Sequence, residues 1–399
     1  MSDSTKTLHL ALQGGGAHGA FTWGALDTLL LDGRLAFAGI SGTSAGAINA
    51  VALAHGWAEA QAARQDPAEG ARAALARVWT RVMELGQANQ SAARMTRLLM
   101  GALSGAMTRL SPYQANPLDI NPLRQLIERE IDFERLAKLK SPRVFVAATD
   151  VETGRAAIFS GKRLTAQAVM ASACLPQLFH APEIDGKQYW DGGYAANPAI
   201  GPLVEMGQTR DVLLVQINPL KRPGKATSAA DIADRVGDLT FNASLIAQMR
   251  TIALINELAA RGVVGEGLQP IHMHRIDGGR ALAEMPASSK IAPQRATLEK
   301  LFELGQASAQ RWLKRHYEAV GNKSSVNLRR DYGDPLKLQF EPPPEAGGEG
   351  EGDAQDGEEG EDGGLDWSRF CWSPDEQRHA ADVADAAART AADAARASR

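Results

Sequence analysis

The sequence has very little cysteine, with Cys174 and Cys371 as its two examples in 399 residues. Two cysteines predict neither a disulfide framework nor a cysteine-based metal site. There is also no uninterrupted apolar run of the roughly 20 residues that a membrane-spanning helix needs. The segment Met1–Thr7 lacks a basic region followed by an apolar core, so no secretory signal is expected. We therefore expect a cytoplasmic protein without a transmembrane segment.

Dense clusters of lysine and arginine with interleaved aromatic residues are also missing, which argues against a nucleic-acid partner. The net charge of −4 is unevenly distributed, because residues 341–366 contain eleven Asp and Glu and no Lys or Arg. Removing those eleven negative charges leaves +7 on the rest of the chain, which is compatible with an anionic lipid surface. The composition, 44% hydrophobic and 23% charged, is that of a folded globular protein.

Short β-rich apolar runs alternate with helical patterns, which predicts the α/β class with a central, mostly parallel sheet. The expected strands are Thr7–Gln13, Ala36–Ser41, Arg143–Thr149, Asp211–Ile217 and Ile271–Ile276, and Arg155–Ser160 is expected to pair with the third of them. The expected helices are Ala20–Leu31, Ala45–His55, Glu69–Leu85, Pro122–Glu130, Thr165–Ala173, Ala229–Arg261 and Pro293–Ala319.

Composition also predicts how the chain is divided. The folded domain is expected to span residues 1–325, with a lid or insertion at 87–120. Within that insertion, Ser91–Tyr113 carries apolar residues at helical spacing beside arginines, which is typical either of a core helix or of a lipid-facing element. Residues 326–366 are rich in Pro, Gly and acidic residues and are expected to be a disordered linker. Residues 367–399 are rich in alanine and predict a C-terminal helix.

Glycines follow the first expected strand at Gly14, Gly16 and Gly19, in the pattern G-x-G-x-x-G. This is the dinucleotide-binding fingerprint when an acidic residue ends the second strand. Here the second strand ends at Ile40-Ser41-Gly42 and carries no acid. The nucleotide-binding interpretation therefore lacks its confirming residue.

The second expected strand leads into Gly42-Thr-Ser-Ala-Gly46 and then a helix, which is G-x-S-x-G in the context of strand, sharp turn and helix. Such a turn exposes the serine hydroxyl, and glycines on both sides leave room for neighbouring backbone. Backbone N–H groups of Gly14, Gly15 and Gly16 on the neighbouring strand could face the oxyanion of an acyl-transfer reaction. The two glycine-rich turns together therefore predict Ser44 as a nucleophile beside an oxyanion hole.

A serine nucleophile needs a base, and the sequence offers two kinds. His272 and His274 on a late strand could complete a Ser-His-Asp triad. Asp191, in Tyr189-Trp-Asp-Gly-Gly193, ends a short strand and could take the proton directly if burial raised its pKa. The residues alone leave both alternatives open.

The three motifs Gly14–Gly19, Gly42–Gly46 and Asp191–Gly193, in this order, resemble the patatin-like phospholipase family. The resemblance implies a three-layer α/β/α fold in which a Ser-Asp dyad hydrolyses acyl esters of lipids without a metal or other cofactor. It assigns Ser44 as the nucleophile and Asp191 as the base. It also implies an oxyanion hole at Gly14, Gly15 and Gly16, with supporting positions at Gly42, Gly46, His18, Gly192 and Gly193.

One position departs from the family pattern, because many members have arginine where this chain has His18. Arginine is a permanently charged, bidentate phosphate binder, whereas a neutral histidine is not. The expected partner is therefore a lipid or ester substrate, phosphate-bearing or neutral, met at a membrane or lipid-body surface. A lipid-binding scaffold of the same fold without turnover is the alternative from another functional class.

Overall fold

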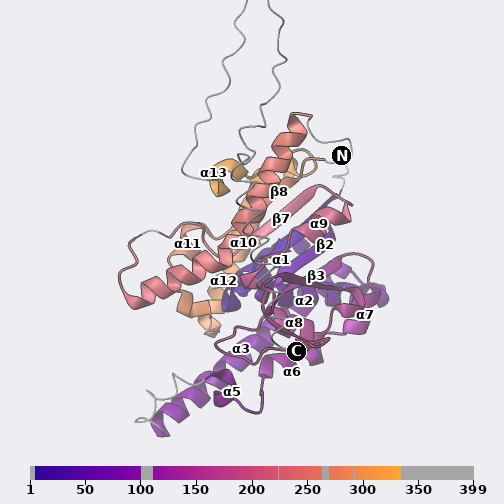
Figure 1. The fold of residues 1–399 in the computed structure, drawn as a ribbon. Coiled ribbons are helices and arrows are strands. Elements are labelled where there is room, and N and C mark those ends of the chain that lie inside the picture. Colours follow the sequence, from indigo (N-terminus) through magenta and orange to yellow (C-terminus); the bar gives the residue numbers. More distant parts are fainter. Residues whose placement is uncertain (1–4, 100–110, 223, 263–268, 291–292, 334–399) are drawn as a thin grey trace, which may run out of the picture. The chain divides into compact units, whose positions relative to one another are not determined.

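An eight-stranded sheet organises the computed structural model, which describes residues 5–99, 111–222, 224–262, 269–290 and 293–333 (Figure 1). The strands are β1 Lys6–Leu12, β2 Leu35–Thr43, β3 Arg143–Asp150, β4 Ala156–Ser160, β5 Glu183–Ile184, β6 Lys187–Asp191, β7 Asp211–Gln216 and β8 His272–Asp277. Their order is β5-β6-β3-β2-β1-β7-β8, and β4 pairs with β3 off this path. Strands β3, β2, β1, β7 and β8 are parallel, whereas β4 and β6 run antiparallel to β3. The predicted central, mostly parallel sheet is thereby confirmed.

Helices cover both faces of this sheet. They are α1 Gly19–Asp32, α2 Ala45–Ala62, α3 Pro67–Leu99, α5 Pro112–Ala115, α6 Pro122–Glu130, α7 Phe133–Lys138, α8 Ala166–Ser172, α9 Gly201–Met206, α10 Ala229–Ala260, α11 Gly279–Ala283, α12 Arg295–His316 and α13 Leu328–Tyr332. Alternation along β1 explains the layers, because successive side chains of a strand point to opposite faces. Leu8, Leu10 and Leu12 pack against α1, α2, α3 and α12, whereas Ala11 lies in a second cluster with residues of α9, α10 and α13. The domain is therefore a three-layer α/β/α structure.

The antiparallel strand β6 brings two chain segments together at one edge of β3. Strand β2 pairs with β3 as far as Thr43 and Ala147. The next residue of β3, Ala148, pairs with Asp191 of β6. Strand β4 pairs with Ala147 and Ala148 from the opposite edge of β3. Strand β6 therefore lies on the same edge of β3 as β2 and begins to pair where β2 ends. The residue after β2, which is Ser44, and the last residue of β6 therefore meet.

The C-terminal boundary of the domain differs from the expectation. Residues 326–333 were assigned to the linker, yet they include α13, whose Leu328 and Tyr332 are buried against α10 and the sheet. Arg250 Nε donates to the carbonyl oxygen of Tyr332 at 2.9 Å, and the Tyr332 hydroxyl donates to Gln216 Oε1 at 2.9 Å. The linker prediction is wrong for this stretch, because apolar and aromatic side chains at helical spacing complete the second core.

Two further predictions fall mainly outside the described residues. Residues 334–399 contain the rest of the expected linker and the expected alanine-rich helix, and they lie outside. In the expected lid, α3 continues as a helix to Leu99 and α5 begins at Pro112, but residues 100–110 also lie outside. The alternatives of lid and core helix stay predictions. Among the described helices, none combines the length and the apolar character needed to cross a membrane.

Candidate active site

The turn at Ser44 has the strained geometry that its sequence pattern predicts. Ser44 has φ 56° and ψ −122°, a backbone conformation that residues with a side chain rarely adopt. A Cβ atom on Gly42 would meet the carbonyl group of Gly46, and one on Gly46 would meet the carbonyl group of Leu12. The sharp turn therefore needs both glycines, as expected. The backbone N–H of Ser44 donates to Ser172 Oγ at 2.8 Å, which helps to hold the turn.

Asp191 lies beside Ser44 and is almost completely buried, with 1% of its surface exposed. Its carboxylate accepts the N–H of Gly193 at 2.7 Å, and the Ser44 side chain lies near enough to influence its pKa. Burial raises the pKa of Asp191 to about 7, although Gly193 and Ser44 both favour the ionised form and oppose the rise. The structure thus brings together the two side chains that the sequence placed 147 residues apart.

The glycine loop between β1 and α1 approaches Ser44 closely, since a Cβ atom on Gly14 would lie 2.8 Å from Ser44 Cβ. The N–H of Gly14 is already used, because it donates to Asn197 Oδ1 at 2.6 Å. The predicted oxyanion role of Gly14 is therefore contradicted. The N–H groups of Gly15 and Gly16 donate to no protein acceptor within the described residues, and both glycines line the same pocket as Ser44.

His18 is buried behind this loop, and its Nε2 lies 2.7 Å from Ser289 Oγ. Ser289 Oγ donates its own proton to the carbonyl oxygen of Pro286 at 2.6 Å, so His18 is the donor to Ser289. Burial, reinforced by nearby Lys290, lowers the pKa of His18 to about 4, which keeps the ring neutral. His18 therefore fastens the segment Ala287–Lys290 to the glycine loop and supplies no charge for a phosphate group.

Three polar residues that the sequence did not single out support the loop. Asn197 accepts the hydrogen bond from Gly14, and Asn218 Nδ2 donates to the carbonyl oxygen of Gly14 at 2.8 Å. Lys290 Nζ donates to Asn218 Oδ1 at 2.7 Å and to Asp238 Oδ1 at 3.0 Å. Isolated Asn and Lys residues in loops carry no local sequence signal, so only their proximity reveals this role.

The two glycines after Asp191 have separate roles. Gly193 supplies the N–H that the carboxylate accepts, and a Cβ atom on it would meet the ring of Phe241. A Cβ atom on Gly192 would meet the carbonyl group of Ala147. Both positions therefore allow β6 to end close to neighbouring groups.

His272 and His274 lie far from Ser44, which excludes them from a triad with it. His274 pairs with Leu213, which in turn pairs with Leu10, and Leu10 pairs with Ile40. Ser44 lies four residues beyond Ile40 and three strands away from β8, a separation of about 20 Å at roughly 3.3 Å per residue and 4.8 Å per strand.

These histidines instead contact a structural acid at the amino end of β7. His274 Nε2 lies 2.9 Å from Asp211 Oδ1, and His272 Nδ1 lies 3.4 Å from the same oxygen. Asp211 also accepts the N–H of Gly321 at 2.8 Å, so the cluster joins the sheet to the segment after α12. The triad alternative with His272 or His274 is therefore wrong.

A cavity of about 430 Å³ opens above Ser44 and Asp191. Its polar lining residues include Ser44, Asp191, Asn218 and Lys290, and most of its wall is apolar, including Ile48, Val82, Leu85, Leu175, Phe179 and Phe241. An apolar cavity with a few convergent polar groups suits a small apolar substrate or an acyl chain. Within the described residues, no group of three His, Cys, Asp or Glu side chains could hold a metal ion.

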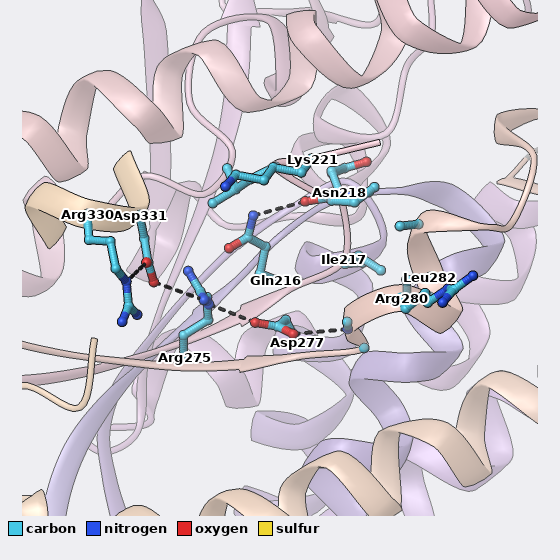
Figure 2. A pocket seen from close by; sticks show the side chains of 15 residues that line it. Gln216, Ile217, Asn218, Lys221, Arg275, Asp277, Arg280, Leu282, Arg330 and Asp331 are labelled. Atoms are coloured by element: carbon cyan, nitrogen blue, oxygen red, sulfur yellow. Dashed lines mark hydrogen bonds and ion pairs between the residues drawn. The ribbon is translucent and has the colours of Figure 1, made fainter. Parts of the chain in front are cut away.

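A second cavity, of about 470 Å³, lies at the carboxyl ends of β7 and β8 (Figure 2). Three of its ion pairs lie within the lining: Arg275 pairs with Asp277 at 2.8 Å and with Asp331 at 3.1 Å, and Asp331 pairs with Arg330 at 2.7 Å. Its lining contains no serine, cysteine or histidine. This cavity therefore offers no serine or cysteine nucleophile and no histidine base, and the ion pair of Arg275 with Asp331 joins β8 to α13.

Comparison with family models matches residues 10–204 to the patatin-like phospholipase family. No curated protein matches the chain. Among solved structures, VipD from Legionella pneumophila matches at 17% identity with a TM-score of 0.36, covering 78% of this chain and 67% of that chain. The family match includes the glycine loop, Ser44 and Asp191, and it indicates lipid acyl hydrolase activity. Residues 10–204 of the chain are therefore similar to the patatin-like phospholipase family, which confirms the resemblance predicted from the sequence.

Proposed function

We propose that this protein hydrolyses acyl ester bonds of lipids, with Ser44 as the nucleophile and Asp191 as its general base. The observation that carries the proposal is the position of the Ser44 side chain beside the buried carboxylate of Asp191, where both residues line the same mostly apolar cavity. The strained backbone of Ser44 also favours an enzyme over a lipid-binding scaffold, because strain of this kind concentrates at functional sites.

In the first half of the reaction, Ser44 Oγ attacks the ester carbonyl carbon while its proton passes to Asp191. The carbonyl oxygen becomes an oxyanion, and the N–H groups of Gly15 and Gly16 face it. One such donor typically lowers the barrier by about 3 to 4 kcal/mol. The tetrahedral intermediate then collapses, the ester C–O bond breaks, and Asp191 returns the proton to the leaving alcohol.

In the second half, a water molecule replaces the alcohol beside the acylated Ser44. Asp191, ionised again, takes a proton from this water as its oxygen attacks the acyl carbon. Collapse of the second intermediate returns the proton to Ser44 Oγ and releases the fatty acid. One acidic group therefore acts as base and acid in both halves.

The raised pKa makes a carboxylate suitable for this work. A general base is most effective when its pKa lies near the working pH, and an ordinary aspartate with a pKa of about 4 is too weak a base at neutral pH. Burial raises the pKa of Asp191 to about 7. The same apolar surroundings that accept an acyl chain therefore also strengthen the base.

The experiment that tests the proposal is labelling with a fluorophosphonate probe, which reacts with an activated serine and requires no choice of lipid. The wild type, Ser44→Ala, Asp191→Asn and the control His272→Ala would be compared, each checked for folding by its thermal melt. We expect labelling of the wild type and of His272→Ala, and none of the two dyad variants. Labelling of Asp191→Asn at the wild-type rate would overturn the assignment of the base.

A further inference from the structure

Large apolar side chains are exposed beside the mouth of the active-site cavity. Four of them, which we call the apolar rim, lie on two segments: Tyr113 in α5 with Leu118 and Ile120 between α5 and α6, and Leu178 after α8. Leu118 is 80% exposed and Ile120 is 59% exposed. Single exposed apolar residues are normal on a protein surface, whereas a cluster of them marks an interaction site.

The apolar rim is continuous with the wall of the cavity. Asn121, Pro122 and Leu123 line the cavity and directly follow Ile120 in the chain. Leu178 belongs both to the rim and to the cavity wall. An acyl chain that left the rim would therefore pass over apolar surface until it reached Ser44.

Hydrogen bonds hold the rim in its exposed position. The Asn116 side chain donates from Nδ2 to the carbonyl oxygen of Ile120 at 3.0 Å and accepts the N–H of Ile120 at 3.1 Å. The N–H of Asp119 donates to the carbonyl oxygen of Asn116 at 3.0 Å. These three bonds close the loop Asn116–Ile120 and leave Leu118 near its tip. A preorganised loop loses little conformational entropy when it docks.

The two segments of the rim are also joined to each other. The ring of Tyr113 stacks on His180 with 4.2 Å between the ring centres. The N–H of Ala181 donates to the Tyr113 hydroxyl at 3.2 Å, and a ring nitrogen of His180 lies 3.1 Å from the carbonyl oxygen of Pro112. The exposed side chains therefore form one surface rather than two independent loops.

Charge is scarce on this surface. Residues 111–123 and 173–182 contain one charged side chain, Asp119, whereas 23% of the whole chain is charged. Asp119 is paired with Arg124 at 3.0 Å. An unpaired charge is expensive to move into an apolar medium, and these two segments contain none. Exposed, uncharged and apolar side chains beside an acyl-sized cavity fit the surface of a lipid aggregate.

We propose that the apolar rim docks on a lipid surface, with Leu118 and Ile120 inserted among the acyl chains, so that a lipid can enter the cavity from the aggregate. The identity of the occupant rests on the proposed lipid hydrolase function, but the docking itself needs no turnover. Binding and catalysis can therefore be measured separately.

The test is sedimentation with phosphatidylcholine vesicles, carried out on full-length protein with Ser44→Ala so that no lipid is hydrolysed. In that background we compare Leu118→Ser, Ile120→Ser and Leu118→Met with the matched control Leu31→Ser. Leu31 is 65% exposed, but it lies in the last turn of α1, near the amino ends of the strands. Burial of one leucine changes partitioning by about tenfold or more.

We expect about tenfold weaker vesicle binding for each serine variant of the rim and unchanged binding for Leu118→Met and Leu31→Ser. With Ser44 restored, Leu118→Ser should hydrolyse a short-chain soluble ester at the wild-type rate and lose activity on vesicles. Equal vesicle binding by all variants, or equal loss in Leu31→Ser, would overturn the proposal. So would a rim variant that binds vesicles normally but changes the oligomeric state, because the rim would then be a protein interface. Vesicle binding that depends on the rim in a protein without hydrolase activity would refute only the proposed function.

Discussion

At pH 8 the carboxylate of Asp191 is ionised inside the protein, and its removal from water destabilises the folded state. Burial raises its pKa from 3.8 to about 7 in the folded protein. Between these two values the folded protein holds a proton that the unfolded chain has already released. Stability from this group is therefore highest below about pH 4 and is lost as the pH rises to 7. Asparagine at this position carries no charge at any pH and can still accept the N–H of Gly193.

We therefore predict that Asp191→Asn is more stable than the wild type at pH 8 and equally stable near pH 4. A shift of about three pKa units corresponds to roughly 4 kcal/mol in the free energy of unfolding, which is the upper bound of the difference. For a folded unit of roughly 330 residues, an unfolding entropy of about 2 cal/mol/K per residue converts this into about 6 °C of melting temperature. The variant should gain this stability and lose esterase activity, because groups that an active site needs often destabilise the folded state.

The assay is thermal melting of the wild type and Asp191→Asn across pH 4.5 to 8.5, with Glu183→Gln as the matched control. Glu183 is an exposed carboxylate on the neighbouring strand β5. Subtracting the melting temperature of the wild type from that of each variant at the same pH removes the contribution of all other titrating groups. The reasoning is refuted if Asp191→Asn melts below the wild type at pH 8, or if its advantage is the same at every pH.

Two further predictions concern the reaction itself. In the proposed mechanism the ionised form of Asp191 is the base, and its pKa is about 7, so kcat/KM for a soluble ester should rise with pH with a midpoint near 7. A flat profile between pH 5 and 8 would contradict this. Asn197→Ala removes the side-chain oxygen that accepts the N–H of Gly14. A buried N–H left without a partner costs about 1 to 3 kcal/mol. We therefore expect kcat to fall about tenfold with little change in KM. Asn197→Asp, which keeps an acceptor oxygen, should retain more activity than Asn197→Ala, and equal loss in both would show that the hydrogen bond is not what matters.

Local sequence patterns predicted most of the elements because the forces that form them are local. The five parallel strands and the β4 hairpin lie within a few residues of their expected bounds, as do α1, α6, α8, α10 and α12. Helices α2 and α3 continue 7 and 14 residues beyond their expected ends at His55 and Leu85. The turn at Ser44 was predictable for the same reason, since its strand, its two glycines and its helix are neighbours in the chain. The linker boundary was misplaced because α13 is short, and its burial depends on α10 and β8 rather than on its own residues.

The choice between two bases needed the tertiary structure. Asp191 and the two late-strand histidines were equally compatible with the residues alone. The position of β6 at the edge of β3 decided between them, because it places Asp191 next to Ser44, whereas β8 lies three strands from β2. Only burial in that place raises the pKa of the carboxyl group, so its suitability as a base is also a property of the fold.

The sequence by itself therefore determined the α/β class, the strained serine turn and the glycine-rich loop, all of which depend on residues close together in the chain. The tertiary structure alone decided which acid meets Ser44 and which loop N–H groups are free. Asn197, distant in sequence, accepts the N–H of Gly14, whereas those of Gly15 and Gly16 have no acceptor within the described residues. A hydrogen bond between distant residues leaves no periodicity in the sequence, because its partners meet only when the sheet has formed.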